Sequence, residues 1–298
     1  MSNKPSKPET SGDNHNIHWF PGHMAKTRRV IEENLKLIDV LVEITDARIP
    51  ESGRNPLLSQ IAGNKPRILL LNKRDYADDS ATRSWLEYYK NVCGITAISC
   101  DCRSGAGLSG LNALFKKINN DSGKRYHGAT RIMAAGIPNS GKSSFINRMA
   151  GGKRAAVGDR PGVTRGKQWV SIKSNKTGEA CEILDLPGIL PPKIEERLAA
   201  LNLAYTGAVK DEVVDVYELA ASLAAFLAEH HSAKLKTRYN LDISADSGNG
   251  NDVLGGIAKS RGMLISGGGL DVERAAFALL DDFRSGKIGK ITLEFPPL

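Results

Sequence analysis

The sequence predicts an α/β domain with a doubly wound, mostly parallel sheet, followed by a small all-helical domain. Two observations indicate this architecture. Short β-rich runs alternate with helical patterns from residue 26 to about residue 192, as strands joined by crossover helices require. After the prolines of PGILPP (187–192), the remaining long segments carry apolar residues at helical spacing.

Apolar runs mark the expected strands of the first domain. The candidates are VLVEITDA (40–47), RILLLNK (67–73), ITAIS (95–99), RIMAAG (131–136), KQWVSI (167–172) and ACEILDL (180–186). Runs such as RILLL, which are apolar at successive positions, suit strands that are covered on both faces. The segments around them predict helices over 25–38 and near 54–62, 79–91, 107–119 and 142–150.

The domain boundaries follow from these patterns. We expect a disordered tail over residues 1–17, the α/β domain over 18–192 and the helical domain over 200–298. Within the last, 211–230 and 271–284 predict amphipathic helices, with a shorter helix between them.

The charge of the chain is uneven. The net charge is +8, from 41 Lys and Arg against 33 Asp and Glu. Residues 1–194 hold 30 of the basic residues and only 18 of the acidic ones. Such an excess commonly accompanies binding to nucleic acid or another polyanion, and a solvated basic surface is the alternative.

The cysteines and the apolar runs exclude several classes of protein. The four cysteines (Cys93, Cys100, Cys102 and Cys181) form no C-x-x-C pair and have no flanking histidines, so neither a zinc site nor a disulfide framework is predicted. No run reaches the roughly 18 apolar residues of a membrane span. The first residues also lack the apolar segment of a signal peptide. We therefore expect a cytoplasmic, monomeric protein without a membrane partner.

The stretch GIPNSGKSSF (136–145) fits the phosphate-loop pattern G-x-x-x-x-G-K-[ST]. It lies between an expected strand and an expected helix, where backbone N–H groups can surround phosphate oxygens. Lys142 would reach the β- and γ-phosphates, and the Ser143 hydroxyl would hold Mg²⁺. The nucleotide contacts predicted in this loop are Asn139, Ser140, Gly141, Lys142, Ser143 and Ser144.

A second phosphate-side motif, DLPG (185–188), ends the last expected strand. It fits D-x-x-G, in which Asp185 would hold Mg²⁺, directly or through water, and the Gly188 N–H would face the γ-phosphate. Between the two motifs, Thr164 is the predicted switch threonine that closes on Mg²⁺ and the γ-phosphate. Thr177 is its competitor, although it resembles hairpin-turn material.

The motif NKRD (72–75) follows RILLL and predicts guanine recognition. The Asp75 carboxylate can accept two parallel hydrogen bonds, and guanine offers N1–H and N2–H₂ side by side, whereas adenine does not. Asn72 would add a polar contact to the base, and the stem of Lys73 would pack along it. Ser99 and Cys100, which close the next expected strand, are candidates for a loop whose backbone contacts the base.

The order of these motifs is unusual. In a Ras-like chain the phosphate loop comes first, and N-K-x-D and the loop whose backbone contacts the base come last. Here N-K-x-D and that loop precede the phosphate loop. A ligand at the carboxyl ends of parallel strands contacts loops where they lie in space, so a cyclically shifted chain can build the same site. The sequence therefore predicts a circularly permuted Ras-like P-loop GTPase domain that uses GTP, GDP and Mg²⁺.

With these motifs in this order, the sequence resembles the RbgA (YlqF) family of circularly permuted GTPases. HWFPGHMAK (18–26), DARIPESGRNP (46–56) and GDRPGVTRGKQW (158–169) are similar to further segments of that family. The resemblance implies a role in assembling the large ribosomal subunit, with its precursor, both rRNA and ribosomal proteins, as partner. The alternative is a GTP-dependent RNA-binding or RNA-remodelling factor that does not act on the ribosome.

The helical domain is similar to the family's C-terminal RNA-binding domain in length and character. It is acidic in balance, so RNA contacts on the basic GTPase face or at KLKTRY (234–239) are alternatives. The motif DLPG lies a few residues before this domain. Loss of the γ-phosphate there could therefore shift the domain directly.

Three residues have roles that the sequence leaves open. Ile189 stands where Ras-like enzymes have the glutamine that orients water. The resemblance implies that His23 takes that role. The alternatives are that His23 is a structural histidine, or that His18 orients the water instead. Asn139 resembles an asparagine that binds K⁺ beside the phosphates, or it forms the turn. Arg48 contacts phosphate or RNA, or pairs with Asp46.

Overall fold

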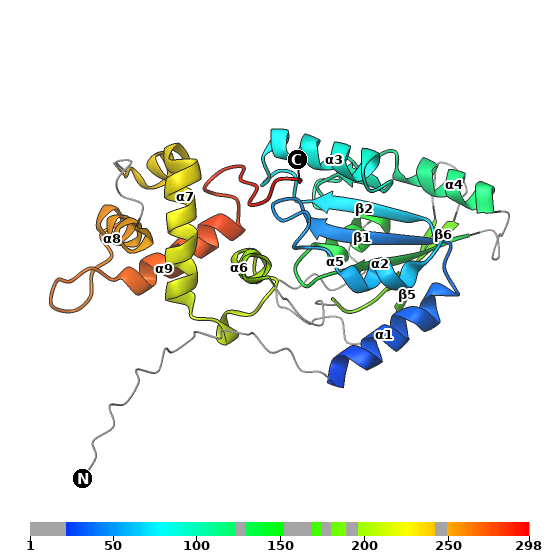
Figure 1. Cartoon of the computed structure of the whole chain (residues 1–298), viewed down its shortest axis with the longest axis horizontal. Coiled ribbons are helices and arrows are strands. Elements are labelled where there is room, and N and C mark those ends of the chain that lie inside the picture. Colours follow the sequence, from blue (N-terminus) through cyan, green and yellow to red (C-terminus); the bar gives the residue numbers. More distant parts are fainter. Residues whose placement is uncertain are drawn as a thin grey trace, which may run out of the picture.

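The computed structural model describes residues 22–122, 129–151, 168–173, 180–188, 196–241 and 249–297. Figure 1 shows a sheet layered between helices and, beside the edge where most of its strands end, a separate group of helices. The α/β part comes first in the chain and the helical part follows, as the sequence predicts.

The sheet has six described strands in the order β3-β2-β1-β4-β6-β5. Their bounds are β1 (Val40–Asp46), β2 (Arg67–Asn72), β3 (Thr96–Ser99), β4 (Thr130–Gly136), β5 (Gln168–Lys173) and β6 (Ala180–Asp185). All neighbouring pairs are parallel except β5 with β6. The order reverses between β1 and β4, and crevices at such a reversal are where ligands bind in open α/β sheets.

Alternate residues of the strands face opposite sides of the sheet and enter different cores. In β1, for example, Val42 and Ile44 belong to one cluster and Leu41 to another. The first face is covered by α4 (Leu111–Ser122) and α5 (Lys142–Met149). The second is covered by α1 (Gly22–Leu35), α2 (Pro56–Ala62) and α3 (Asp79–Asn91). This burial on both sides accounts for the continuous apolar runs in the sequence.

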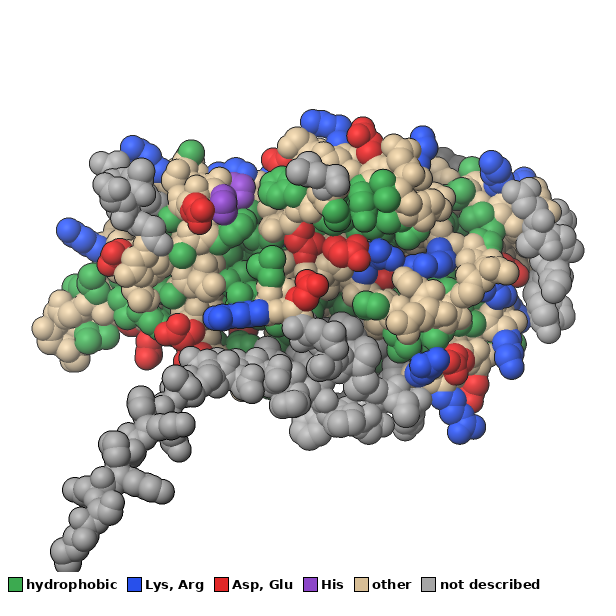
Figure 2. Space-filling view, viewed as in Figure 1, with side chains coloured by type: hydrophobic (Ala, Val, Ile, Leu, Met, Phe, Trp, Pro, Cys, Tyr) green, Lys and Arg blue, Asp and Glu red, His purple; other side chains and the backbone are tan. Residues whose placement is uncertain are grey.

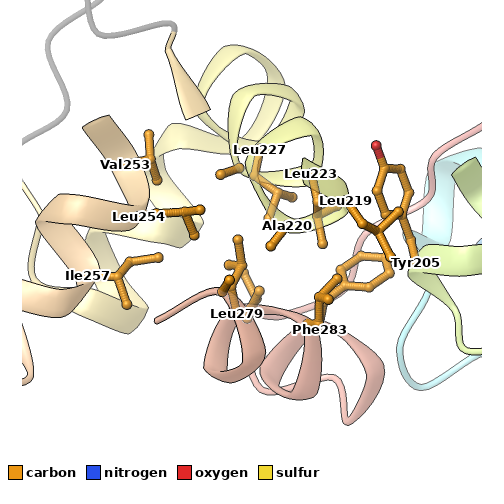
Figure 3. Close-up of a cluster of buried hydrophobic side chains, with 14 of the residues drawn as sticks. Tyr205, Leu219, Ala220, Leu223, Leu227, Val253, Leu254, Ile257, Leu279 and Phe283 are labelled. Carbon is orange, nitrogen blue, oxygen red and sulfur yellow. The ribbon is translucent and has the colours of Figure 1, made fainter. Parts of the chain in front are cut away.

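The helical part contains α6 (Arg197–Tyr205), the short 3₁₀ helix η1 (Asp211–Val213), α7 (Val216–Tyr239), α8 (Gly250–Ser260) and α9 (Val272–Arg284). Figure 3 shows apolar side chains of α7, α8 and α9 meeting in one cluster, among them Leu223, Leu254 and Leu279. Two residues of the α/β part, Ile49 and Ile137, are buried in that same cluster. The two parts of the chain therefore share a hydrophobic core.

Polar side chains fix where several of these helices begin. Asp215, Asn249 and Asp271 each accept a hydrogen bond from a backbone N–H in the first turn of α7, α8 and α9. Such caps satisfy N–H groups that have no partner inside the helix. Helix α7 ends at Tyr239 and is capped by Asn240, which has a left-handed backbone with φ of 53°.

The predicted elements match the observed ones closely, with shifts at the helix ends. The expected strands are all present, within about two residues of their predicted bounds. The helix expected over 211–230 is instead η1 followed by α7, which continues to Tyr239 through non-helical backbone angles at His231. Helix α1 ends three residues before the predicted limit of 38. None of the helices that the structure describes is long and apolar enough to cross a membrane.

Candidate nucleotide site

The motifs predicted from the sequence follow strands that end at one edge of the sheet. Asn72 ends β2, Ser99 ends β3, Gly136 ends β4 and Asp185 ends β6. These strands run parallel, so their carboxyl ends lie together. The cyclically shifted order of the motifs along the chain is therefore no obstacle to a single site.

The phosphate loop joins β4 to α5, and two of its glycines are required by their surroundings. A Cβ atom on Gly136 would lie 2.4 Å from the carbonyl oxygen of Ile44. Gly141 caps α5 with φ of 97°, and a Cβ there would lie 2.0 Å from Nδ2 of Asn72. The loop thus packs directly against the neighbouring strand and against the base-side motif.

Lys142 and Asp185 form a buried ion pair at the start of α5, with Nζ bonded to Oδ1. The two side chains are 7% and 6% exposed. Buried charges are stable only when they are paired in this way. The pair brings the lysine of the phosphate loop onto the aspartate of D-x-x-G.

The same residues have the oxygen donors that Mg²⁺ prefers. Asp185 supplies a carboxylate, and Ser143 in the first turn of α5 supplies a hydroxyl. The Ser140 hydroxyl is buried and has no partner among the described residues. Gly188 lies against the loop, since a Cβ there would be 3.0 Å from the backbone nitrogen of Pro138. A site for a magnesium-bound phosphate fits these groups.

Asn72 joins three loops into one unit. Its Nδ2 donates to the carbonyl oxygen of Ser140 at 2.7 Å, and its Oδ1 accepts from the backbone N–H of Cys102 at 2.9 Å. The side chain is 3% exposed. Both ends of the amide are therefore occupied by structural contacts, and the expected polar contact from Asn72 to the base stays a prediction.

Asp75, the last residue of NKRD, is exposed. Partial burial raises the pKa of its carboxyl, and the neighbouring carboxylate of Asp101 acts in the same direction. No other described side chain forms an ion pair or hydrogen bond with this carboxylate. Its own backbone N–H donates to it, and the remaining lone pairs of its two oxygens can accept hydrogen bonds from a base.

Lys73 has a left-handed backbone with φ of 61°, and its Nζ lies 2.9 Å from Oδ2 of Asp46. Burial lowers the pKa of Lys73, and the carboxylate of Asp46 opposes that effect. Of the two roles left open for Arg48, the structure shows the pair with Asp46. Its Nε and Nη2 bind the two carboxylate oxygens at 3.0 and 2.8 Å.

The loop after β3 closes the base side of the site. The backbone N–H of Arg74 donates to the carbonyl oxygen of Cys100 at 3.1 Å, which ties this loop to NKRD. Gly107 has φ of 82°, and a Cβ there would lie 2.2 Å from the carbonyl oxygen of Ser99. The thiols of Cys100 and Cys102 are buried, and their sulfur atoms lie 3.8 Å apart.

Asn139 has φ of 60°, and its Nδ2 donates to the carbonyl oxygen of Gly207 at 2.7 Å. Gly207 belongs to the helical part, just after α6. The phosphate loop is thereby bonded to the helical part. This contact gives no preference between the two roles that the sequence left open for Asn139.

Some predicted residues lie outside what the structure describes. Thr164, its competitor Thr177, and Ile189 fall in ranges that are not described. His18 precedes the first described residue. His23 lies in α1, but its side chain is not described. Within the described ranges, no group of three or more His, Cys, Asp or Glu is placed to hold a metal ion.

Sequence reasoning missed the residues that act through the backbone. Cys102 binds Asn72 through its N–H and Gly207 binds Asn139 through its carbonyl oxygen. Every residue has such groups, so the residue type carries no signal. The sequence also did not predict that Ile137 is buried in the helical cluster. An apolar residue in a phosphate loop does not indicate by itself which part of the chain it packs against.

Comparisons with known proteins identify the family of this chain. Residues 131–240 match the family described as "50S ribosome-binding GTPase". The chain is 44% identical over 288 residues to "Ribosome biogenesis GTPase A" of Priestia megaterium, covering 94% of this chain and 97% of that protein. It is 33% identical over 301 residues to "Mitochondrial ribosome-associated GTPase 1" of Mus musculus, covering 93% and 89%.

Two solved structures are also similar. One is GNP-bound YlqF from T. maritima, with a TM-score of 0.60 and 28% identity over 91% of this chain and 98% of that chain. The other, a GDP-bound YlqF, has a TM-score of 0.60 and 26% identity over 90% and 99%. The family match begins at β4, the strand that precedes the phosphate loop, and leaves out the base-side half that this chain encodes first.

Proposed function

Because the chain belongs to the ribosome biogenesis GTPase A family, we propose that this edge of its sheet binds GTP and hydrolyses it during assembly of the large ribosomal subunit. One observation carries the assignment of the site. The hydrogen bond from Asn72 to Ser140 joins the base-side and phosphate-side motifs, which are 68 residues apart, into a single site. The circularly permuted P-loop fold and the GTP hydrolase activity are those of the family.

On the base side, Asp75 would accept hydrogen bonds from N1–H and N2–H₂ of guanine. Its exposed carboxylate supports this role. The aliphatic stem of Lys73 would lie along the base while its ammonium stays with Asp46. Ser99 and Cys100 would place backbone groups at the edge of the same base.

On the phosphate side, binding requires a rearrangement of the buried ion pair. Lys142 would leave Asp185 for the β- and γ-phosphates, and Asp185 would then be free to hold Mg²⁺ together with Ser143 and Thr164. Mg²⁺, when bound, would neutralise charge that develops on the phosphate oxygens. A K⁺ ion beside Asn139 is a further part of the proposal. The Asn139 side chain would have to release Gly207 to bind it.

Hydrolysis by the free protein should be slow, because Ile189 cannot hydrogen-bond to the attacking water. We propose that His23 orients or deprotonates the water once the ribosomal particle is bound. The nucleotide state would then decide when the protein leaves the particle.

The partner in this proposal is a precursor of the large ribosomal subunit, contacted by a monomer in the cytoplasm. The names of the relatives support a ribosomal partner. Figure 2 shows Lys and Arg side chains over both parts of this face, with a group of acidic side chains near its middle. This distribution favours RNA contacts that are spread over both parts rather than confined to the helical one.

The test is steady-state GTP turnover with and without purified large-subunit precursor particles. We expect slow turnover alone, stimulation by particles, loss of turnover in Lys142→Ala, and loss of the stimulation in His23→Ala. Fast turnover by the free protein, or full stimulation of His23→Ala, would contradict the catalytic proposal. Sedimentation with a non-hydrolysable GTP analogue tests the partner. Failure to comigrate with the particles would favour the RNA-remodelling alternative.

A further inference from the structure

A cluster of charges is formed by the buried Asp46 and Arg48 and the partly buried Lys73 of NKRD. Asp46 ends β1 next to Asn72, the last residue of β2. The Asp46 and Arg48 side chains are 3% and 1% exposed, and the guanidinium grips the carboxylate through two hydrogen bonds. The backbone N–H of Arg48 also donates to the same carboxylate at 3.0 Å. This arrangement fixes the orientation of the Asp46 carboxylate.

The orientation of Asp46 matters to the loop because Lys73 depends on it. Burial by itself would raise the pKa of Asp46, but the charges of Arg48 and Lys73 hold that pKa well below its ordinary value. Lys73 follows the first residue of NKRD directly and occupies a left-handed conformation that costs energy for a residue with a side chain. Its ion pair with Asp46 is the described contact that holds the side chain in place.

Arg48 reaches the helical part through its remaining nitrogen. Its Nη1 donates to the carbonyl oxygen of Phe283, in the last turn of α9, at 2.8 Å. The guanidinium carbon lies 4.9 Å from the centre of the Phe283 ring and 5.5 Å from that of Tyr76. Tyr76 directly follows Asp75. Arg48 therefore contacts the helical part and flanks NKRD at the same time.

The segment after α9 makes further contacts with the same loops. We call residues 291–294 the C-terminal strap. The N–H of Ile291 donates to the carbonyl oxygen of Tyr76, and the N–H of Leu293 donates to that of Arg48, both at 2.8 Å. Gly286, also after α9, lies so close to the Tyr76 ring that a Cβ would be 2.4 Å from it. The helical part and the strap therefore contact Tyr76, the residue that follows NKRD, and Arg48 in the loop after β1.

We propose that Arg48 is a positioning residue for guanine recognition, and that it couples the geometry of NKRD to the docking of the helical part. It would act through Asp46, which holds Lys73, and through Tyr76, which adjoins Asp75. The inference rests on the proposed role of NKRD in reading guanine. If so, a partner that moves the helical part changes the affinity for guanine at NKRD. It does not act only on the phosphate contacts near DLPG.

Affinities for GDP and for inosine diphosphate test the proposal. Inosine lacks the 2-amino group, so the ratio of the two affinities measures how well the Asp75 carboxylate is aligned with the base. The variant Arg48→Lys keeps the positive charge. A lysine cannot make the two bonds to the Asp46 carboxylate and also the bond to the carbonyl oxygen of Phe283. We expect its GDP affinity to fall about tenfold, with a smaller loss for inosine diphosphate, as for the loss of one charge-assisted hydrogen bond.

A second variant approaches from the other part of the molecule. Phe283→Leu removes the ring beneath the guanidinium but keeps an apolar side chain, and it lies outside the nucleotide site. We expect it to lower the same ratio by about threefold, in line with the loss of a cation–π contact. It also tests the idea if Arg48→Lys does not fold.

The matched control is Arg238→Lys, which alters an arginine–aspartate pair with Asp282 inside the helical part. It should leave the ratio unchanged. Equal losses for both nucleotides in Arg48→Lys and Phe283→Leu would show a merely structural role and overturn the inference. The variant Asp75→Asn distinguishes the proposed function of NKRD from the role of Arg48. If Asp75→Asn left the ratio of the two affinities unchanged, NKRD would not recognise guanine, and the inference about Arg48 would fail with it.

Discussion

Gly141 occupies a position where both the backbone and the neighbouring side chain exclude any larger residue. Its φ is 97°, and an added Cβ would lie 2.0 Å from Nδ2 of Asn72. We expect Gly141→Ala to break the bond from Asn72 to Ser140 and to abolish nucleotide binding. The free energy of unfolding should fall by about 3 kcal/mol or more, because backbone strain and overlap add together. Urea unfolding and binding of a fluorescent GDP analogue would measure both effects.

Gly151 offers the matched control for that substitution. It also has a positive φ, of 70°, but an added Cβ would meet nothing within 4 Å. Gly151→Ala should therefore cost only the backbone term of about 1–2 kcal/mol and leave nucleotide affinity intact. Equal losses of stability in the two variants would show that contact with Asn72 is unimportant.

Single residues also show how far sequence reasoning reaches. Roles for Lys142 and Asp75 could be proposed from the sequence alone, because the chemistry of phosphate and guanine requires those residue types at fixed positions in a loop. The role of Arg48 could not be decided in the same way. Its partners include Asp46, two residues away, and the carbonyl oxygen of Phe283, 235 residues away. Only the folded chain brings the second partner near.

At the scale of elements, the central strands β1, β2 and β4 were predictable because they are buried on both faces and are therefore apolar. Helix ends were predicted less well. The limit of α7 at Tyr239 depends on the left-handed Asn240 and on packing against α8 and α9, which local periodicity does not report. The C-terminal strap was not predicted, because its partners, such as Ser52 for the Glu294 carboxylate and Asp78 for the Thr292 hydroxyl, lie more than 200 residues away in the sequence.

The strap should be essential for docking of the helical part. The strap bonds to Tyr76 and Arg48, and it also bonds to Trp85. The carbonyl oxygen of Glu294 accepts a hydrogen bond from Nε1 of Trp85 at 3.0 Å, and Trp85 is only 2% exposed. We expect truncation after Lys290 to expose Trp85, to shift its emission to longer wavelength and to speed proteolysis between the two parts. Fluorescence spectra and limited proteolysis would measure this.

Truncation after Phe295 is the control for the strap. It removes only the last three residues and keeps every strap contact named above. Its emission and its proteolysis rate should match those of the full chain. If the longer truncation behaved like this shorter one, the strap would have no role in docking.

At the scale of the whole molecule, the two parts are joined by a shared core as well as by polar contacts. Ile49, beside Arg48, and Ile137, in the phosphate loop, are 0% and 2% exposed within the helical cluster. Asn139 adds its bond to Gly207. Each of these residues adjoins a loop of the nucleotide site. The helical part therefore packs on the loops that a nucleotide would order.

This arrangement predicts that GDP stabilises the helical part although it binds elsewhere. A ligand at 100 times its Kd stabilises the folded state by about 2.7 kcal/mol. If the shared core makes unfolding cooperative, amides of α8 should gain protection from hydrogen exchange together with those of β1 and β4. Exchange measured by mass spectrometry, with and without GDP, tests this. Protection confined to the sheet, with α8 unchanged, would mean that the helical part opens independently. The contacts of Ile49, Ile137 and Asn139 would then be too weak to transmit nucleotide binding.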